Sequence, residues 1–191
     1  MLIGIMGKTG SGKSTIAQLL NKDDKYIIID VDKVNHDLIE NTSLKQDIIM
    51  QYPDVNENGK INRKKLGMIL YQNNEKMKEY NKLVWSYLEK RLDEIIESSS
   101  KPIIIDWMML PITKYYDRCD IKILVDSNSE ERLNRIKIRD NVDENHFIAR
   151  DKNSIDYNKE DFDFIIENNK GIDENEIESI RKCITLCKRK K

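Results

Sequence analysis

Five short apolar runs occur along the chain, and polar or charged residues follow each of them. The runs are residues 2–6, 26–30, 102–106, 120–126 and 162–167. Short runs in which apolar residues predominate are typical of strands that are buried on both faces of a parallel sheet. Stretches with apolar residues three and four positions apart separate the runs and predict helices. The pattern therefore predicts an α/β protein with a five-stranded, mostly parallel sheet and helices on both faces.

The stretch between the second and third runs is the longest and is helical in pattern. One helix is expected to end before Pro53, because the residue that precedes a proline disfavours the helical conformation. Residues 56–59, Asn-Glu-Asn-Gly, have the composition of a turn. Apolar residues at helical spacing from Met77 to Ile96 then predict one long amphipathic helix.

A glycine-rich loop follows the first predicted strand and leads into the first predicted helix. Residues 7–14 read Gly-Lys-Thr-Gly-Ser-Gly-Lys-Ser, which matches the P-loop pattern G-x-x-x-x-G-K-S. Glycines let the chain curl so that backbone N–H groups point at phosphate oxygens, and the following helix adds its positive N-terminal end. The glycine spacing does not match the dinucleotide pattern G-x-G-x-x-G. The motif therefore predicts a site for a nucleoside triphosphate.

Two residues of this loop have separate expected roles. Lys13 is expected to reach the β- and γ-phosphates of ATP, and the Ser14 hydroxyl is expected to ligate Mg²⁺. ATP and Mg²⁺ are therefore the predicted cofactors. The residues expected to contact ATP from this loop are Gly7, Lys8, Thr9, Gly10, Ser11, Gly12, Lys13, Ser14 and Thr15.

Carboxylates close the second and third predicted strands, at the sheet edge where α/β proteins bind ligands. Asp106 ends the third strand, as the Mg²⁺-organising carboxylate of P-loop enzymes does, so it is a candidate metal ligand. We favour Asp32 as the base for an attacking hydroxyl, because a carboxylate just beyond a strand end can reach an acceptor near the γ-phosphate. Asp30 competes for this role or for a place near the metal. A helix N-cap is the alternative role of Asp32.

The remaining candidate site residues are three arginines and a histidine. The helix after the fourth strand is expected to begin with Ser129 as its cap and to end near Arg139. Arg139 and Arg150 are candidates to spread the charge of a phosphoryl-transfer transition state. Arg63 is a candidate partner for an anionic acceptor, and His36 is a candidate hydrogen-bond partner of the acceptor.

These patterns predict a single domain, residues 1–191, with three parts. A chain of 191 residues is long enough for one well-buried core and too short for two of ordinary size. The polar stretch beyond Arg139 has the composition of a lid. By analogy with other P-loop kinases, the long helical stretch is expected to hold the acceptor. The predicted core is residues 1–42, 101–139 and 162–191, the helical acceptor-binding insertion is 43–100, and the lid is 140–161.

Composition narrows the class of protein. Hydrophobic residues make up 39% and charged residues 35% of the chain, as in soluble globular proteins. The formal net charge of −1 argues against a general nucleic-acid binder. No apolar run approaches the roughly 20 residues of a membrane span, and the three cysteines form no metal-ligand pattern. We therefore expect a cytoplasmic monomer that acts on small molecules and binds neither nucleic acid nor membranes.

The order and spacing of five segments resemble the dephospho-coenzyme A (dephospho-CoA) kinase family. Besides the P-loop, residues 30–36 are similar to its D-x-D-x-x-x-H segment and residues 59–66 to its G-x-I-x-R-x-x-L stretch. Residues 139–140 are similar to its R-D pair at the lid entry, and residues 163–168 to its late D-F-x-I-x-N strand. The resemblance covers most of the chain.

The resemblance implies a function and roles for several residues. It implies a P-loop kinase of the nucleoside-monophosphate-kinase type that phosphorylates the 3′-hydroxyl of the ribose of dephospho-CoA with ATP, the last step of coenzyme A biosynthesis. It implies Asp32 as catalytic base and Arg63 and His36 as acceptor-side residues. It also implies that Arg139 lies over the ATP phosphates and Asn168 near the nucleotide base.

Departures from the family pattern leave the acceptor open. Residues 7–9 read Gly-Lys-Thr where the family usually has Gly-Gly-Ile, and residues 108–112 read Met-Met-Leu-Pro-Ile where it usually has P-L-L-F-E. Residues 140–161 have no clear match to the family's glutamine and lysine pattern. A nucleoside or nucleotide kinase on the same fold is therefore an alternative, and so is a P-loop protein that binds nucleotide without catalysis.

Overall fold

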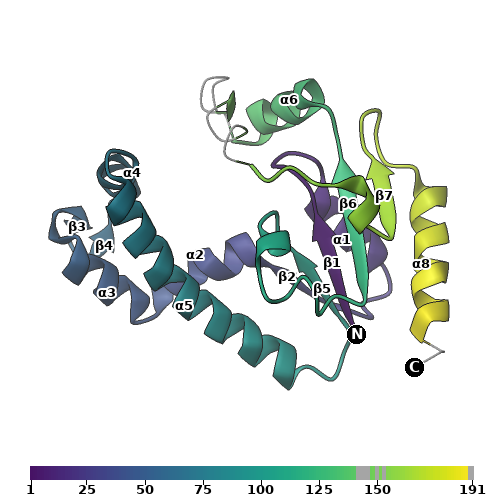
Figure 1. Ribbon diagram of the computed structural model, residues 1–191, viewed down its shortest axis with the longest axis horizontal. Coiled ribbons are helices and arrows are strands. Elements are labelled where there is room, and N and C mark those ends of the chain that lie inside the picture. Colours follow the sequence, from purple (N-terminus) through teal and green to yellow (C-terminus); the bar gives the residue numbers. More distant parts are fainter. Residues whose placement is uncertain (141–146, 149–150, 152–153, 189–191) are drawn as a thin grey trace. The chain divides into compact units, whose positions relative to one another are not determined.

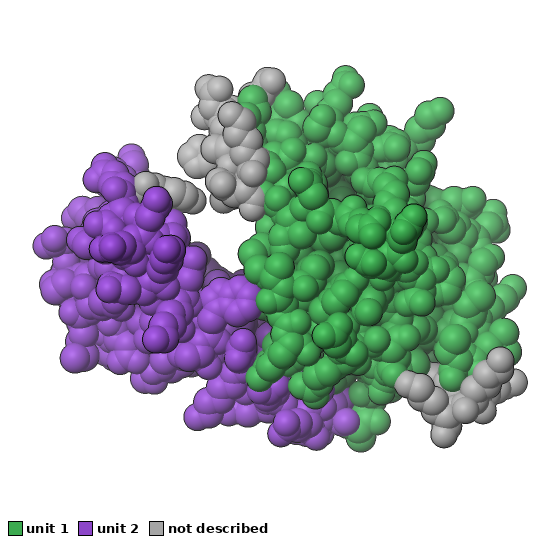
Figure 2. Space-filling view, in the orientation of Figure 1, with its two compact units in different colours: residues 1–30, 100–191 green, residues 31–99 purple. Residues whose placement is uncertain are grey.

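The computed structural model describes residues 1–140, 147–148, 151 and 154–188. The chain divides into two compact units, one formed by Met1–Asp30 with Ser100–Lys191 and the other by Val31–Ser99. Figure 2 shows the first unit in green and the second in purple. The second unit begins at Val31, twelve positions before the insertion that the sequence pattern delimits at residue 43.

The first unit is built on a five-stranded sheet in which every strand pairs in parallel (Figure 1). The order across the sheet is β2-β5-β1-β6-β7, so the first strand lies in the centre. The fold class and the five predicted strands are thereby confirmed. The strand bounds are β1 (Leu2–Met6), β2 (Ile27–Asp30), β5 (Ile103–Asp106), β6 (Ile121–Asp126) and β7 (Phe164–Glu167).

The carboxyl ends of these strands meet at one edge of the sheet because the strands are parallel. In the register of β5, Asp106 lies opposite Asp30 of β2 on one side and Ile5 of β1 on the other. The loop that leaves β1 after Met6 therefore starts beside Asp106, and Asp30 lies one strand further along the same edge.

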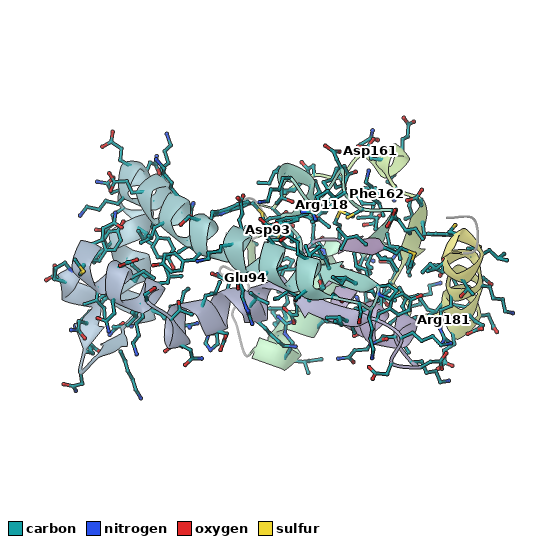
Figure 3. All side chains as sticks on the ribbon, turned by 90° about the horizontal axis from the view of Figure 1, so that it is seen from below. Asp93, Glu94, Arg118, Asp161, Phe162 and Arg181 are labelled. Atoms are coloured by element: carbon teal, nitrogen blue, oxygen red, sulfur yellow. The ribbon has the colours of Figure 1, made fainter. Side chains whose placement is uncertain are left out.

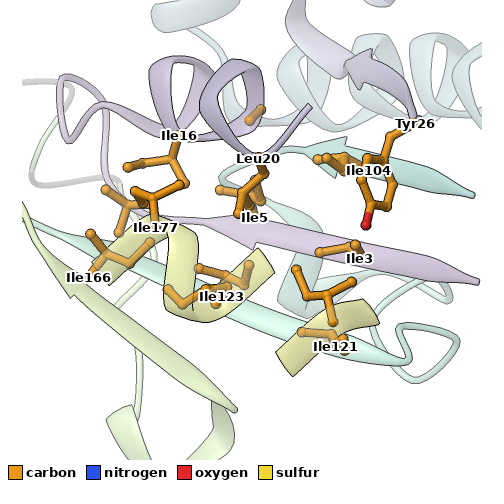
Figure 4. Close-up of a cluster of buried hydrophobic side chains, with 14 residues drawn as sticks. Ile3, Ile5, Ile16, Leu20, Tyr26, Ile104, Ile121, Ile123, Ile166 and Ile177 are labelled. Carbon is orange, nitrogen blue, oxygen red and sulfur yellow. The ribbon is translucent and has the colours of Figure 1, made fainter. Parts of the chain in front are cut away.

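Helices α1 (Lys13–Leu20) and α8 (Glu174–Lys188) pack on one face of the sheet. Figure 4 shows Ile16 and Ile177, one from each helix, over the strand residues Ile5 and Ile123. Burial of one such side chain contributes about 1.5–3 kcal/mol, so this layer holds β1 and α1 firmly in place. The loop between β1 and α1 is consequently supported at both ends.

The segment after β5 covers part of the opposite face. It contains the short 3₁₀ helix η2 (Leu110–Ile112), and Tyr115 is fully buried. A Cβ atom at Gly4 of β1 would lie 2.7 Å from a methyl group of Leu110, so this segment packs closely on the central strand.

Helix α6 (Ser129–Asp140) follows β6. Its cap is Asn128, whose Oδ1 accepts a hydrogen bond of 2.9 Å from the backbone N–H of Glu131. The prediction of Ser129 as the cap was wrong, because Ser129 is already the first residue of the helix and Asn128 occupies the last non-helical position. A short 3₁₀ helix, η3 (Lys159–Asp161), precedes β7.

The second unit is mainly helical. Side-chain oxygens of Asn62 and Asn73 accept hydrogen bonds from backbone N–H groups in the first turns of α4 and α5, which favours the start of each helix at this point. Its elements are α2 (Val31–Asn41), α3 (Leu44–Gln51), η1 (Pro53–Val55), β3 (Asn56–Glu57), β4 (Lys60–Ile61), α4 (Arg63–Tyr71) and α5 (Asn74–Ser98).

The predicted turn in this unit is the tip of a two-stranded antiparallel hairpin. Asn58 and Gly59 have φ angles of 53° and 78°, which suits the tight Asn-Gly turn of a hairpin. The hairpin ends directly before α4 and so places Arg63 at the first position of that helix. Among the described residues, no helix combines the length and hydropathy that crossing a bilayer requires.

Candidate active site

The P-loop, residues 7–14, is curled around the N-terminal end of α1. Gly7 and Gly12 have φ angles of 149° and 103°, a region that side-chain-bearing residues rarely adopt. The N–H of Ser11 donates to the Lys8 carbonyl over 3.1 Å, and the N–H of Ile16 donates to the Gly12 carbonyl over 3.1 Å. A curled loop at a helix N-terminus is the arrangement that binds phosphate groups.

There is no room for a side chain at either of these glycines. A Cβ atom at Gly7 would lie 2.3 Å from the Val125 carbonyl oxygen of β6, and one at Gly12 would lie 2.4 Å from Nδ2 of Asn168. The glycines of the motif therefore let the loop pack directly against β6 and against the residue that follows β7.

Asn168 and Arg135 hold the carbonyl side of the loop. Asn168 is 5% exposed, and its Nδ2 donates to the Ser11 carbonyl over 2.8 Å. Arg135 of α6 donates to the Gly10 and Ser11 carbonyls over 3.3 Å each and to the Asn168 carbonyl over 2.6 Å. The Gly10 and Ser11 carbonyls thus accept hydrogen bonds from α6 and from the end of β7. This leaves the loop N–H groups to face a ligand.

Arg132 and Arg135 are site residues that the sequence analysis missed. Arg132 is 4% exposed and forms a two-pronged ion pair of 2.6 and 3.0 Å with Asp151. The sequence feature that could have identified them is the spacing of the arginines at positions 132, 135 and 139. This spacing places the three side chains on one side of a helix that directly follows a strand.

The Arg132–Asp151 pair makes the stability of the protein depend on pH. Hydrogen bonds from the Arg132 guanidinium hold the pKa of Asp151 below its ordinary value of 3.8. A carboxyl whose folded pKa is lowered stabilises the fold above its unfolded pKa, and this contribution is lost as pH falls through the folded pKa. We expect the thermal midpoint of Asp151→Asn to lie below that of the parent at about pH 6 and the gap to narrow below about pH 4. Circular dichroism melts at several pH values measure the gap, and a gap that does not change with pH contradicts the expectation.

Oxygen donors for a cation gather at the end of β5. Ser14 Oγ donates a hydrogen bond of 2.6 Å to Oδ2 of Asp106, which is 5% exposed. Asp30 lies opposite Asp106 in the sheet register, and Ser14 and Thr15 are exposed in the first turn of α1. Mg²⁺ prefers hard oxygen ligands and takes only one or two carboxylates from the protein, so this donor set fits Mg²⁺. The part of the chain that the structure describes holds no group of three or more His, Cys, Asp or Glu side chains arranged for a metal.

The lysines of the P-loop lie on different parts of it. Nζ of Lys13 lies 3.5 Å from the Lys8 carbonyl oxygen, so the Lys13 side chain folds back over the loop. The Lys8 ammonium group forms an ion pair of 2.9 Å with Asp156. Thr9 Oγ1 lies 3.8 Å from the sulfur of Met108, in the segment after β5. Lys13 is therefore the loop lysine that lies over the curled backbone.

Tyr157 connects two segments that depart from the family sequence pattern. Its hydroxyl donates to the Met108 carbonyl over 2.8 Å, and burial raises its pKa, which keeps it a donor at neutral pH. The segment after residue 154 is thereby attached to the chain after β5, and the neighbouring Asp156 attaches it to Lys8 of the P-loop.

Arg139 is exposed in the last turn of α6, one helical turn beyond Arg135. Arg135 contacts the P-loop, and Arg139 follows it on the same helix. Arg150 lies outside the described residues.

In the second unit, the predicted acceptor-side residues lie together. Nη2 of Arg63 contacts Nδ1 of His36 and forms an ion pair of 2.9 Å with Glu40. A guanidinium only donates hydrogen bonds, so Nδ1 of His36 is the acceptor. Asp32 is exposed in the first turn of α2, inside the helix rather than at its cap. Asp32, His36 and Glu40 are four positions apart and share one face of α2.

Comparisons with known proteins agree on one family. Residues 1–174 match the sequence model of the family described as dephospho-CoA kinase. The dephospho-CoA kinase of Fusobacterium nucleatum is 30% identical over 91% of this chain and 92% of its own. That of Leptospira interrogans is 31% identical over 90% of this chain and 86% of its own.

Solved structures show the same fold. A protein of Thermus thermophilus superposes with a TM-score of 0.82 at 22% identity, covering 97% of this chain and 96% of its own. A dephospho-CoA kinase of Campylobacter jejuni gives a TM-score of 0.58 at 19% identity, covering 97% of this chain and 96% of its own. A shikimate kinase of Acinetobacter baumannii gives a TM-score of 0.57 at 14% identity, covering 96% of this chain and 92% of its own.

Proposed function

Since this chain belongs to the dephospho-CoA kinase family, we propose that it transfers the γ-phosphoryl group of ATP to the 3′-hydroxyl of the ribose of dephospho-CoA, giving coenzyme A and ADP. The observation that carries this proposal is the curled P-loop that ends in the Ser14–Asp106 hydrogen bond, in a chain whose residues 1–174 match the family. P-loop enzymes of phosphoryl transfer hold Mg²⁺ with a hydroxyl at the end of the loop and an aspartate, as Ser14 and Asp106 are arranged here.

We propose that the P-loop binds the β- and γ-phosphates of ATP through its backbone N–H groups. The side chains of Asn168 and Arg135 support this binding mode, because they donate hydrogen bonds to the loop carbonyls and so orient the N–H groups toward the phosphates. Lys13 supplies the positive charge that the β- and γ-phosphate oxygens need. In this proposal Asn168 acts through the loop, because its side-chain amide bonds to the Ser11 carbonyl.

Ser14 and Asp106 would hold Mg²⁺, and Asp30 lies beside them in the register. Bound Mg²⁺ neutralises charge on the phosphate oxygens. This assignment rests on the oxygen donors that the two side chains present and on the small number of protein ligands that Mg²⁺ takes.

We propose Asp32 as the base of the reaction. The ribose 3′-oxygen forms a bond to the γ-phosphorus while the bond from that phosphorus to the bridging oxygen breaks, and ADP leaves with the electron pair. The proton of the 3′-hydroxyl passes to the carboxylate of Asp32. Arg63 and His36 bind the acceptor, and Arg139 spreads charge on the transferring group.

The experiment is a reaction of the purified chain with ATP, Mg²⁺ and dephospho-CoA, followed by ³¹P NMR of the product. A new phosphate on the ribose 3′-oxygen is the expected result. Nucleosides, nucleoside monophosphates and shikimate serve as competing acceptors under the same conditions. Turnover of one of these without turnover of dephospho-CoA contradicts the proposal.

Ser14→Ala tests the proposed Mg²⁺ ligands. The variant loses one oxygen ligand, so we expect the Mg²⁺ concentration for half-maximal activity to rise by about tenfold or more. Titration of activity with Mg²⁺ at saturating ATP measures this change. Gln18→Ala, at an exposed position further along α1 and outside the P-loop, is the control and is expected to leave the Mg²⁺ requirement within about twofold.

A further inference from the structure

Helix α6 carries a buried charge that the proposed reaction does not use. Arg132 is 4% exposed and lies two helical turns before Arg139. Burial of a guanidinium is costly unless the group is paired and hydrogen-bonded. Its surroundings must therefore supply several acceptors.

Three segments of the first unit meet at the Arg132 side chain. Nε donates to the Ser127 carbonyl over 3.1 Å, and Nη1 donates to the Thr9 carbonyl of the P-loop over 3.3 Å. The two Nη atoms donate to the two carboxylate oxygens of Asp151 over 2.6 and 3.0 Å. A guanidinium is a rigid plane, so these bonds are geometrically linked: a shift of Asp151 turns the donor that holds Thr9.

The Asp151 side of this arrangement is itself anchored. The Asp151 carbonyl accepts hydrogen bonds from the N–H and the hydroxyl of Ser154, over 3.1 and 2.6 Å. Asp156, two positions further on, pairs with Lys8 of the P-loop. Two neighbouring loop residues, Lys8 and Thr9, are thus attached to the same short stretch of chain.

We propose that Arg132 is a positioning residue for ATP binding: with Asp151, it holds the Thr9 carbonyl turned toward α6, so that the loop N–H groups face the phosphates. This inference deepens the proposed function and rests on it for the identity of the nucleotide. A pair that only stabilised the fold would change the melting temperature and the active fraction without changing the affinity of folded protein for ATP.

Two variants separate positioning from stability. Arg132→Lys keeps the charge but lacks the planar fork, and the double variant Arg132→Met with Asp151→Leu removes both charges together. Replacement of both partners of a buried ion pair by apolar residues is often neutral for stability. We expect the Kd of Mg·ATP, measured by calorimetry without acceptor, to rise by about fivefold in both variants, as for the loss of one hydrogen bond to the loop. The KM for dephospho-CoA is expected to stay within about twofold.

The matched control is the Arg181–Asp23 pair of the same unit. Arg181 lies on α8 (Figure 3) and contacts Asp23 over 2.6 Å and Glu178 over 2.8 Å. Arg181→Met with Asp23→Leu is expected to leave the Kd of Mg·ATP unchanged, whatever its effect on the thermal midpoint.

The outcomes distinguish this inference from the proposed function. An unchanged Kd of Mg·ATP in both Arg132 variants overturns it, and so does an equal rise in the KM values for ATP and dephospho-CoA. The binding measurement needs no acceptor. A parent that binds ATP and fails to phosphorylate dephospho-CoA therefore contradicts the proposed function alone.

Discussion

Asp32→Asn is expected to lower kcat by about 10²-fold or more while leaving the Kd of Mg·ATP within about twofold. An amide of the same shape cannot accept the proton of the ribose hydroxyl, so the loss falls on the chemical step. ATP is bound in our proposal by the P-loop and Lys13, which the substitution does not alter. Single-turnover kinetics with dephospho-CoA and calorimetry with ATP measure the two quantities.

Asp37→Asn is the matched control for this experiment. Asp37 is an exposed carboxylate on the same helix, and it accepts a hydrogen bond of 2.6 Å from Asn41. We expect this variant to retain the parent kcat within about twofold. Asp30→Asn tests the competing base: a loss of turnover in that variant alone, with Asp32→Asn active, contradicts our assignment and transfers the role to Asp30.

Gly7→Ala is expected to disrupt the P-loop and lower the stability of the whole protein. The added Cβ atom would lie 2.3 Å from the Val125 carbonyl oxygen, which belongs to the backbone of a central strand and cannot turn aside. This clash and the unfavourable φ angle of 149° are together expected to lower the free energy of unfolding by about 3–4 kcal/mol, which corresponds to a fall of about 10 °C in thermal midpoint. The affinity for Mg·ATP is expected to fall by about tenfold or more, because the loop must move to relieve the clash. Thermal melts and calorimetry report the two effects.

Gly171→Ala separates the clash from the backbone strain. Gly171 also has a positive φ angle, 104°, but a Cβ atom there would meet nothing within 4 Å. Only the strain remains, so we expect about 1 kcal/mol of destabilisation and unchanged ATP binding. Equal effects of the two substitutions contradict the role assigned to packing against β6.

The sheet was predictable because its signal is local. Runs such as residues 103–105, which are apolar at every position and are followed by Asp106, are typical of strands buried on both faces. The two short strands of the hairpin, Asn56–Glu57 and Lys60–Ile61, were recognised only as a turn, since two-residue strands have no periodicity to detect. The cap of α6 was misplaced by one residue because Asn128 and Ser129 are both good capping residues, and the path of the chain decides between them.

The candidate site was partly predictable for the same reason. Lys13 and Ser14 follow from a contiguous motif, and Asp106 follows from its place at the end of an apolar strand. The supporting residues Arg132 and Arg135 were missed, because arginines at helical spacing are usually on a solvated face. Their burial depends on partners far away in the chain: Asn168 lies 33 positions from Arg135, and Thr9 lies 123 positions from Arg132.

What the sequence determined by itself is therefore the phosphate-binding loop, the order of strands and helices, and the family, since each rests on residues adjacent in the chain or on their spacing. Only the tertiary structure decided which groups hold that loop: the 2.6 Å hydrogen bond from Ser14 to Asp106 spans 92 positions, and the loop carbonyls are held from α6 and from the end of β7. The physical reason is that hydrogen bonds and burial depend on distance in space, which the parallel sheet makes small at one edge for residues that the chain keeps far apart.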